Sequence, residues 1–212
     1  MLGRTHFFIG TAAALAVLQP QTVPALVAGA GAAAIGGLIS DIDVGTSQAH
    51  RDADKIITAT VAVAVLTILA EYKLNLGIYR RLTSDSSVLR LLAGTAAFLL
   101  ICAYGKQQPH RSFMHSFAAL ALLTACVDII YPDVSAYFAV GFLSHLVLDF
   151  FNRKPEKLFW PWKKGFCLGL CSARGLVNRA LIGCGMVSLA VILVLSAPAG
   201  RLMAKIMRAI YG

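Results

Sequence analysis

The stretch that decides the fold reads Gly141-Phe142-Leu143-Ser144-His145-Leu146-Val147-Leu148-Asp149-Phe150-Phe151. It predicts an apolar helix that carries two ionisable residues, His145 and Asp149, four positions apart. Because residues at this spacing lie on one face of a helix, one turn apart, both side chains point the same way. A titratable pair in a segment that otherwise suits lipid is costly unless other groups partner it, so the pair predicts a functional site.

The composition places this helix in a membrane. Of the 212 residues, 58% are hydrophobic and 14% are charged, and the mean hydropathy is +0.74. Soluble domains carry about 25% charged residues, so a soluble globular protein is excluded. The net charge of +9 comes from basic residues in short loops between apolar runs. Positive loops beside membrane helices are typical of cytoplasmic faces, so the charge does not indicate a nucleic-acid partner.

The other apolar runs predict an all-α, multi-pass transmembrane bundle that forms one domain over residues 1–212. We expect about six or seven hydrophobic helices. The first two, at 7–18 and 25–39, are short for a bilayer, which needs about 20 residues, so they are expected to be shallow, tilted or re-entrant. The others are expected at 56–70, 88–104, 112–131, 134–151 and 180–197, followed by a basic amphipathic tail over 201–212.

Cysteines play a packing role in this reading. Two or three of the five lie in apolar helices, where a thiol acts as a small packing residue. We therefore expect reduced structural thiols. The alternative is a redox or metal role, for which the Cys167-x-x-x-Cys171 spacing is weak evidence. The five are Cys102, Cys126, Cys167, Cys171 and Cys184.

Counting membrane crossings brings the candidate ligands to one side. An even number of predicted crossings separates each group of His and Asp residues from the next, so all should lie at the same membrane face. Twelve Lys or Arg fall on that side and seven on the other, which predicts a cytoplasmic face. The candidate ligands are His6, Asp41, Asp43, His110, His115, His145 and Asp149.

Imidazoles and carboxylates are the nitrogen and oxygen ligands of zinc, manganese and iron. We expect a divalent metal, with zinc as the first choice and manganese or iron as alternatives. Seven candidates are more than one tetrahedral ion needs, so the site would hold two ions, or one ion with carboxylates outside the ligand shell. Two divalent ions against three carboxylates leave a surplus positive charge, which would attract an anion such as a phosphate ester.

Several of these residues also have plainer interpretations. His145 and Asp149 alone could be a hydrogen-bonded pair within the bundle, and Arg111 could be a positive flank rather than a phosphate ligand. His115 is predicted inside the fifth helix, where a lone imidazole needs a partner, and Ser112 is a candidate cap of that helix. His50 lies in a charge-rich loop, where exposure to solvent explains it.

An ordered set of short motifs extends over nearly the whole chain. They are Thr5-His6, Ser40-Asp41-Ile42-Asp43, His110-Arg111-x-x-Met114-His115-Ser116, Gly141-x-x-Ser144-His145-x-x-x-Asp149 and Leu158-Phe159-Trp160-Pro161. The set resembles the bacterial inner-membrane metal-dependent hydrolases, the LexA-regulated membrane hydrolase group. That family usually has Thr where Met114 stands. The resemblance implies a multi-pass helical protein of the inner membrane, a divalent metal and a hydrolytic activity.

The leading hypothesis is therefore a membrane-embedded metal-dependent hydrolase acting at the bilayer interface. Its substrate would be a lipid or lipid-linked phosphoester or ester, because the site lies at the bilayer boundary. A water bound to the divalent ion would lose its proton near neutral pH and attack that bond. The catalytic candidates are Asp43 and Asp149 as general bases and Arg111 as an anion ligand. The candidates for substrate binding are Arg111, Lys154, Trp160 and Trp162, the last two fixing the depth of the lipid.

Two other functions remain open at this stage. The same residues could form a divalent-cation or proton transport pathway, because intramembrane Asp and His also mark relays. A pathway needs polar residues at successive depths, whereas here they gather at one face. The third possibility is a non-catalytic structural or signalling membrane protein in which the metal only stabilises the fold. The oligomeric state is left open.

Overall fold

The computed structural model describes residues 1–45, 86–172 and 175–211, and these ranges form a helical bundle without strands. The predicted all-α membrane bundle is thus confirmed. The predicted helix at 56–70 and His50 lie outside the described residues. The described α-helices are α1 (Gly3–Leu18), α2 (Val23–Ile39), α5 (Ser86–Lys106), α6 (Phe117–Ile130), α7 (Pro132–Phe150), α8 (Leu176–Leu195) and α9 (Ala197–Tyr211), with 3-10 turns η1 (Ser40–Asp43) and η2 (Phe113–His115).

Four of the described helical segments are long and apolar enough to cross a membrane. They are Val23–Asp43, Ser87–Lys106, Pro132–Phe150 and Leu176–Leu195. The helix α1 has 16 residues, or about 24 Å, and is short as expected. The helix α2 is longer than predicted, because Thr22 caps its first turn, Pro24 is tolerated there, and η1 continues it.

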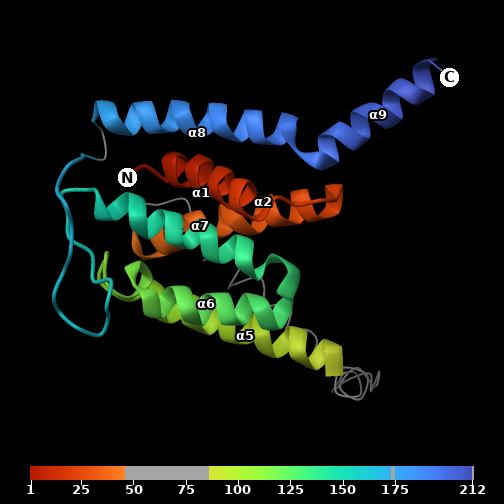
Figure 1. Ribbon diagram of the computed structural model, residues 1–212. Coiled ribbons are helices and arrows are strands. Elements are labelled where there is room, and N and C mark those ends of the chain that lie inside the picture. Colours follow the sequence, from red (N-terminus) through yellow and green to blue (C-terminus); the bar gives the residue numbers. More distant parts are fainter. Residues whose placement is uncertain (46–85, 173–174, 212) are drawn as a thin grey trace.

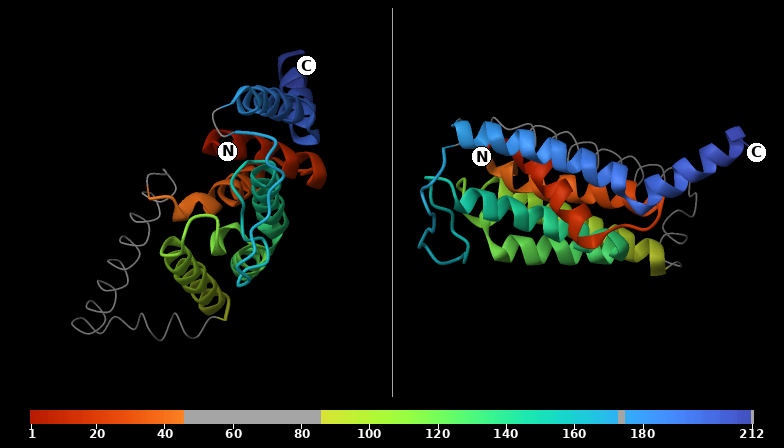
Figure 2. Two further views of the ribbon diagram at one scale, coloured as in Figure 1. Left: turned by 90° about the vertical axis from the view of Figure 1, so that its left-hand side faces the viewer. Right: turned by 45° about the horizontal axis from the view of Figure 1, so that its top comes forward.

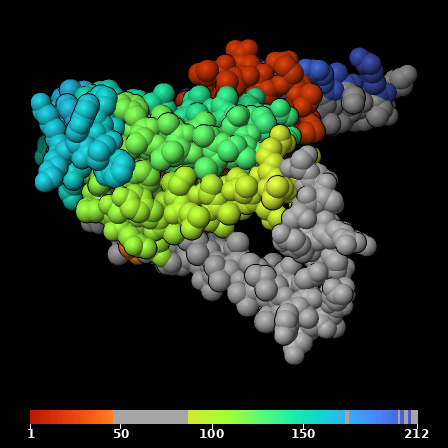
Figure 3. Space-filling model, turned by 90° about the horizontal axis from the view of Figure 1, so that it is seen from below, coloured from red at the N-terminus to blue at the C-terminus, as the bar shows by residue number. Residues whose placement is uncertain are grey.

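The helices lie side by side and alternate in direction (Figure 1). The helices α1, α6 and α8 begin at the end of the bundle where α2, α5 and α7 finish. The helix α7 packs against α1, α2 and α6, which makes it central to the bundle. Views from the end and from below show the loop after α7 gathered at that same end (Figures 2 and 3).

Backbone-to-backbone packing holds α2 against α7. A Cβ atom added to Gly36 would lie 2.2 Å from the carbonyl oxygen of Phe138, and one added to Gly141 would lie 2.2 Å from that of Ala33. Only glycine leaves room for this approach. Small residues at such crossings are the usual way in which membrane helices come close together.

The beginning of α6 differs from the prediction. The helix starts at Phe117, and its cap is Ser116, whose hydroxyl accepts a hydrogen bond from the Ala119 N–H, rather than Ser112. His115 therefore lies in the turn η2 and not in the α-helix. Serine is among the favoured N-caps, and with Ser116 at this position the helix cannot extend back to 112.

Apolar side chains anchor both turns to the bundle. The main cluster combines residues of α5, α6 and α7 with one residue of η1 and two of η2, so that η1 and η2 are fixed over the end of α7. The buried cluster is Ile42, Cys102, Phe113, Met114, Ala119, Leu123, Phe138, Phe142 and Leu146.

All five cysteines are free, and two of them, Cys102 and Cys126, are buried.

The last helices begin earlier than predicted. The helix α8 starts at Leu176, and only Asn178 and Gly185 on it are buried. The remainder of α8 is largely exposed and apolar, which suits a helix that faces lipid. The helix α9 diverges from the bundle at its far end (Figure 1).

Gly36→Ala should destabilise the protein by about 1–3 kcal/mol, because its methyl group must push the α7 backbone away. Gly31→Ala, on the same helix, is the matched control. A Cβ there meets nothing within 4 Å, so that variant should stay within about 1 kcal/mol of the original protein or gain stability. Thermal unfolding in detergent measures both, and equal midpoints for the two variants would contradict the packing argument.

Candidate metal centre

The seven predicted ligands come together at one end of the bundle. They form three overlapping groups, and the donor atoms within each group lie within 4.8 Å of one another. His145 belongs to the first and second groups and His115 to the second and third, so the groups form one continuous cluster. The groups are His6, His145 and Asp149; Asp41, His115 and His145; and Asp43, His110 and His115.

The middle group has the spacing expected of ligands on one ion. The Nε2 atoms of His115 and His145 are 3.3 Å apart. They lie 3.9 and 3.8 Å, respectively, from Asp41 Oδ1. Two ligand atoms at 2.0–2.1 Å from a tetrahedral zinc ion stand about 3.3–3.4 Å apart. Small side-chain movements would therefore bring all three donors onto one ion.

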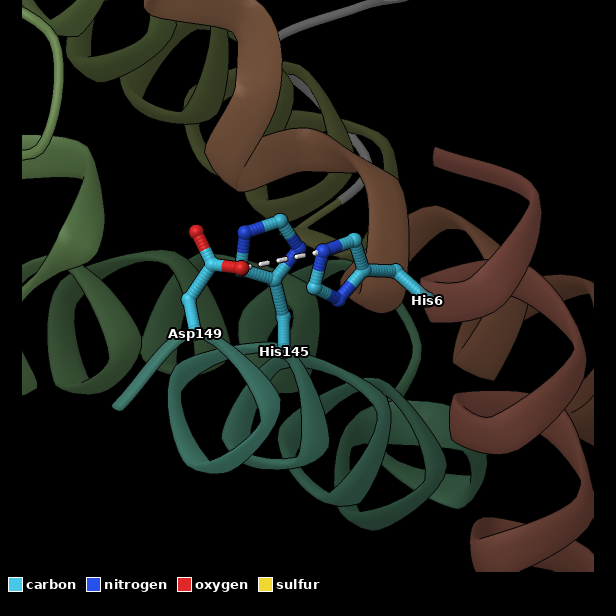
Figure 4. A group of neighbouring side chains, drawn as sticks. All are labelled: His6, His145 and Asp149. Atoms are coloured by element: carbon cyan, nitrogen blue, oxygen red, sulfur yellow. Dashed lines mark ion pairs between the residues drawn. The ribbon is translucent and has the colours of Figure 1, made fainter. Parts of the chain in front are cut away.

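Figure 4 shows that His6 of α1 faces His145 and Asp149 of α7. His6 Nε2 lies 3.4 Å from Asp149 Oδ1, and the His6 ring stacks on that of His145 with 3.7 Å between centroids. Asp149 Oδ2 is also 3.8 Å from His115 Nε2. This group therefore adjoins the middle one.

A backbone carbonyl and a carboxylate lie beside the Nδ1 atoms of two of the rings. His145 Nδ1 lies 2.8 Å from the carbonyl oxygen of Gly37, to which it can only donate, so Nε2 keeps its lone pair. Asp43 Oδ2 lies 3.4 Å from His115 Nδ1, at ion-pair distance but without hydrogen-bond geometry. Backbone carbonyls and carboxylates hold metal-ligating histidines in this way.

Several buried nitrogens have no hydrogen-bond partner among the described residues. Among the imidazoles they are both ring nitrogens of His6, of which Nε2 faces Asp149, and Nδ1 of His115, which faces Asp43. Buried polar atoms are almost always satisfied by a partner or an ion. The donor set and these orphaned atoms both fit a divalent cation.

Asp43 and His110 are arranged differently. Asp43 Oδ1 is 2.8 Å from His110 Nδ1, an ordinary hydrogen-bond distance, and Oδ2 accepts from the Arg111 N–H at 3.2 Å. Both oxygens of Asp43 are therefore already engaged. The His110 side chain is 39% exposed, unlike the other imidazoles of the cluster.

The backbone and the side chain of Arg111 both contact residues of the cluster. Its φ of +64° is unusual for a residue with a Cβ, and this conformation directs the N–H toward Asp43. Its guanidinium donates from Nη2 to Asp149 Oδ2 and from Nη1 to the Lys154 carbonyl oxygen. The amino group of Met1 also contacts Asp149.

A cavity of about 410 Å³ opens beside the cluster. Its wall combines carboxylates of the cluster with three cationic side chains, so that an anion entering it would meet positive charge next to the metal ligands. The lining residues are Met1, Asp41, Val44, His110, Arg111, Asp149, Asn152, Arg153, Lys154 and Ser172.

Only two of the four predicted substrate-binding residues line this cavity. Arg111 and Lys154 line the cavity, but neither tryptophan does. Trp160 packs on Tyr104 and Phe113. Trp162 is 70% exposed in the loop after α7.

Sequence reasoning missed two buried polar residues at this end. Asn178 of α8 accepts a hydrogen bond from Thr5 at 2.7 Å, which fixes the start of α1 beside His6. Glu156 is completely buried, and neither of its carboxyl oxygens has a hydrogen-bond partner in the part of the chain that the structure describes. Glu156 was hidden because it lies among lysines and arginines in a loop that reads as solvated. An apolar helix that contains a lone Asn is the only sequence signal for Asn178.

Burial raises the pKa of Glu156 from its ordinary value of 4.5 to about 8. The charge of Asp149 raises this pKa further, while Arg111 and the amino terminus lower it. The folded protein therefore holds this proton more tightly than the unfolded chain does.

The stability of the metal-free protein should consequently depend on pH through Glu156. Its contribution is complete below pH 4.5 and is lost as the pH rises toward about 8. Glu156→Gln should flatten this part of the curve of unfolding free energy against pH, whereas Asp133→Asn, at an exposed position of α7, should leave it unchanged. A curve that keeps its slope in Glu156→Gln would refute the assignment.

Comparison with known proteins identifies a family. Neither the curated proteins nor the solved structures gave a match. The family described as YdjM inner membrane protein matches residues 1–210, which supports an inner-membrane location together with the apolar helices. Since this match covers nearly the entire chain, the chain belongs to the YdjM inner membrane protein family.

Proposed function

We propose that the protein is a metal-dependent hydrolase embedded in the inner membrane, acting on a lipid or lipid-linked phosphoester or ester at the bilayer surface. One observation carries the proposal. The cavity at the end of the bundle joins a cluster of imidazoles and carboxylates to Arg111, Arg153 and Lys154. Such a wall suits an ester that carries negative charge.

We propose one ion with five protein donors, drawn from the first two groups of the cluster. Asp43 and His110 are already hydrogen-bonded to each other, so they serve to orient the ligands, as the contact from Asp43 to His115 indicates. Zinc remains the first choice, and manganese or iron is the alternative because five donors exceed a tetrahedral set. The five are His6, Asp41, His115, His145 and Asp149.

A divalent ion held there would polarise the ester oxygen and lower the pKa of water. The protein residues then have separate tasks. Arg153 and Lys154 bind the anionic group of the substrate. The buried Arg111 lines the same cavity and adds its positive charge there. Asp149 lines the cavity and Asp43 does not, so Asp149 is the better placed of the two carboxylates to accept a proton.

The loop after α7 supports the assignment to the bilayer surface. Phe159 and Trp162 are 46% and 70% exposed in it, and exposed aromatic residues are typical of the membrane interface. The excess of basic residues at this end favours the cytoplasmic face.

The transport alternative is less well supported. Among the described residues, the buried acidic, basic and histidine side chains all belong to the cluster or to the turns and loop beside it. A second cavity at the opposite end is lined by mostly apolar residues and by no ionisable side chain. A relay would need titratable groups at successive depths, and the described residues do not provide them.

Purified protein should carry close to one divalent ion per chain, measured by elemental analysis. His145→Ala should remove most of the bound metal, because His145 belongs to two of the three groups and alanine offers no ligand atom in its place. Ser144→Ala, at the next position of α7, is the matched control and should retain the ion. Metal-free protein with all its histidines intact would count against the centre.

Hydrolysis should be detectable with phospholipid mono- and diester vesicles and should stop when a chelator is added. Asp149→Asn should lower kcat/KM by at least about 100-fold, in the range seen when one catalytic group is lost. Asp133→Asn, exposed at the opposite end of α7, should leave the activity unchanged. Metal-loaded protein that cleaves no ester in this panel would contradict the proposed reaction.

A further inference from the structure

Glu156 is held in place by its own backbone. Its N–H donates to the Phe166 carbonyl oxygen at 3.0 Å, and the Phe166 N–H donates back at 2.8 Å. The side chain is nevertheless completely buried and has no hydrogen bond to the described residues. A fixed backbone that buries an unpaired carboxyl group is costly, so this position requires a physical explanation.

The residues on both sides of Glu156 are bonded to Arg111. The Lys157 N–H donates to the Arg111 carbonyl oxygen at 3.0 Å, and Arg111 Nη1 donates to the Lys154 carbonyl oxygen. The Arg111 Nε is buried and has no hydrogen-bond partner among the described residues. Arg111 is therefore bound to Asp149 through its guanidinium and to the residues on both sides of Glu156.

We propose that Glu156 is the alternative carboxylate partner of Arg111, which the guanidinium takes when a divalent cation engages Asp149. This inference rests on the proposed metal centre. Arg111 donates to Asp149 Oδ2, and the Met1 amino group contacts Oδ1. A divalent ion on Asp149 competes for those lone pairs and repels the guanidinium, because like charges a few ångströms apart in a buried site repel strongly.

The exchange would explain both unpaired groups at once. Glu156 supplies the receiving carboxylate, and Arg111 Nε supplies a donor that has no partner while the guanidinium remains on Asp149. Arg111 also stays in the cavity wall, since its backbone is fixed by Asp43 and Lys157. Glu156 is thus a positioning residue, which acts on the site through Arg111.

A double-mutant cycle on the full chain tests the exchange without any metal. Unfolding midpoints are measured in chelator for the original protein, Glu156→Gln, Asp149→Asn and the double variant. Glu156→Gln alone should change the midpoint little, because Arg111 is still bound to Asp149. In the Asp149→Asn background it should lower the midpoint by several degrees, since Arg111 then depends on Glu156.

The matched control repeats the cycle with Asp133→Asn in place of Asp149→Asn, and there the two effects should add. Additive effects in the Asp149→Asn cycle would overturn the inference. Where Asp149→Asn fails to fold, zinc titration of the original protein, Glu156→Gln and Glu156→Asp provides the second measurement. The Gln variant should bind zinc roughly tenfold more weakly, and the Asp variant should recover part of the affinity.

Equal zinc affinities for the original protein and Glu156→Gln would also overturn the inference. Original protein that binds no divalent ion would instead defeat the proposed metal centre. The metal-free cycle would then still decide whether Glu156 and Asp149 share Arg111. The two failures are therefore distinguishable.

Discussion

The close contact between the backbones of α2 and α7 is the constraint on which the rest of the structure depends. Gly36 and Gly141 allow the two helices to touch, with added Cβ atoms reaching 2.2 Å from opposing carbonyl oxygens. The same approach brings the Gly37 carbonyl to 2.8 Å from His145 Nδ1. That carbonyl belongs to the last turn of α2, where oxygens lack partners within the helix. The packing of the fold and the orientation of one candidate ligand thus arise from the same contact.

The second requirement is electrostatic. Asp41, Asp43 and Asp149 lie together with four imidazoles at the end of an otherwise apolar bundle. Buried carboxylates, here those of Asp43 and Asp149, need positive partners. Arg111 and the Met1 amino group provide part of this charge at Asp149. The unpartnered ring nitrogens of His6 indicate where a cation would supply the rest.

The sequence was sufficient for the class of fold and for the convergence of the candidate ligands. Apolar run lengths gave the helices, and the parity of crossings gave the common end for His6, His115 and His145. It was insufficient for local detail. Ser112 and Ser116 are equally plausible caps by residue type, and only the packing of Met114 and Phe113 decides between them. Glu156 was missed because burial of a loop carboxylate depends on tertiary contacts that a basic local sequence conceals. The roles of the site residues in catalysis stay predictions.

The loop after α7 is attached to the bundle by main-chain bonds. Leu168 donates to Phe150, Leu170 and Cys171 donate to Phe151, and Lys157 donates to Arg111. Attachment of this kind depends on peptide groups, which every residue except proline provides in full. Side chains that face the cavity from this loop, such as those of Arg153 and Lys154, are therefore free to diverge among descendants of a common ancestor. The scaffold could acquire new specificities by drift in this loop while its helices and buried histidines stay the same.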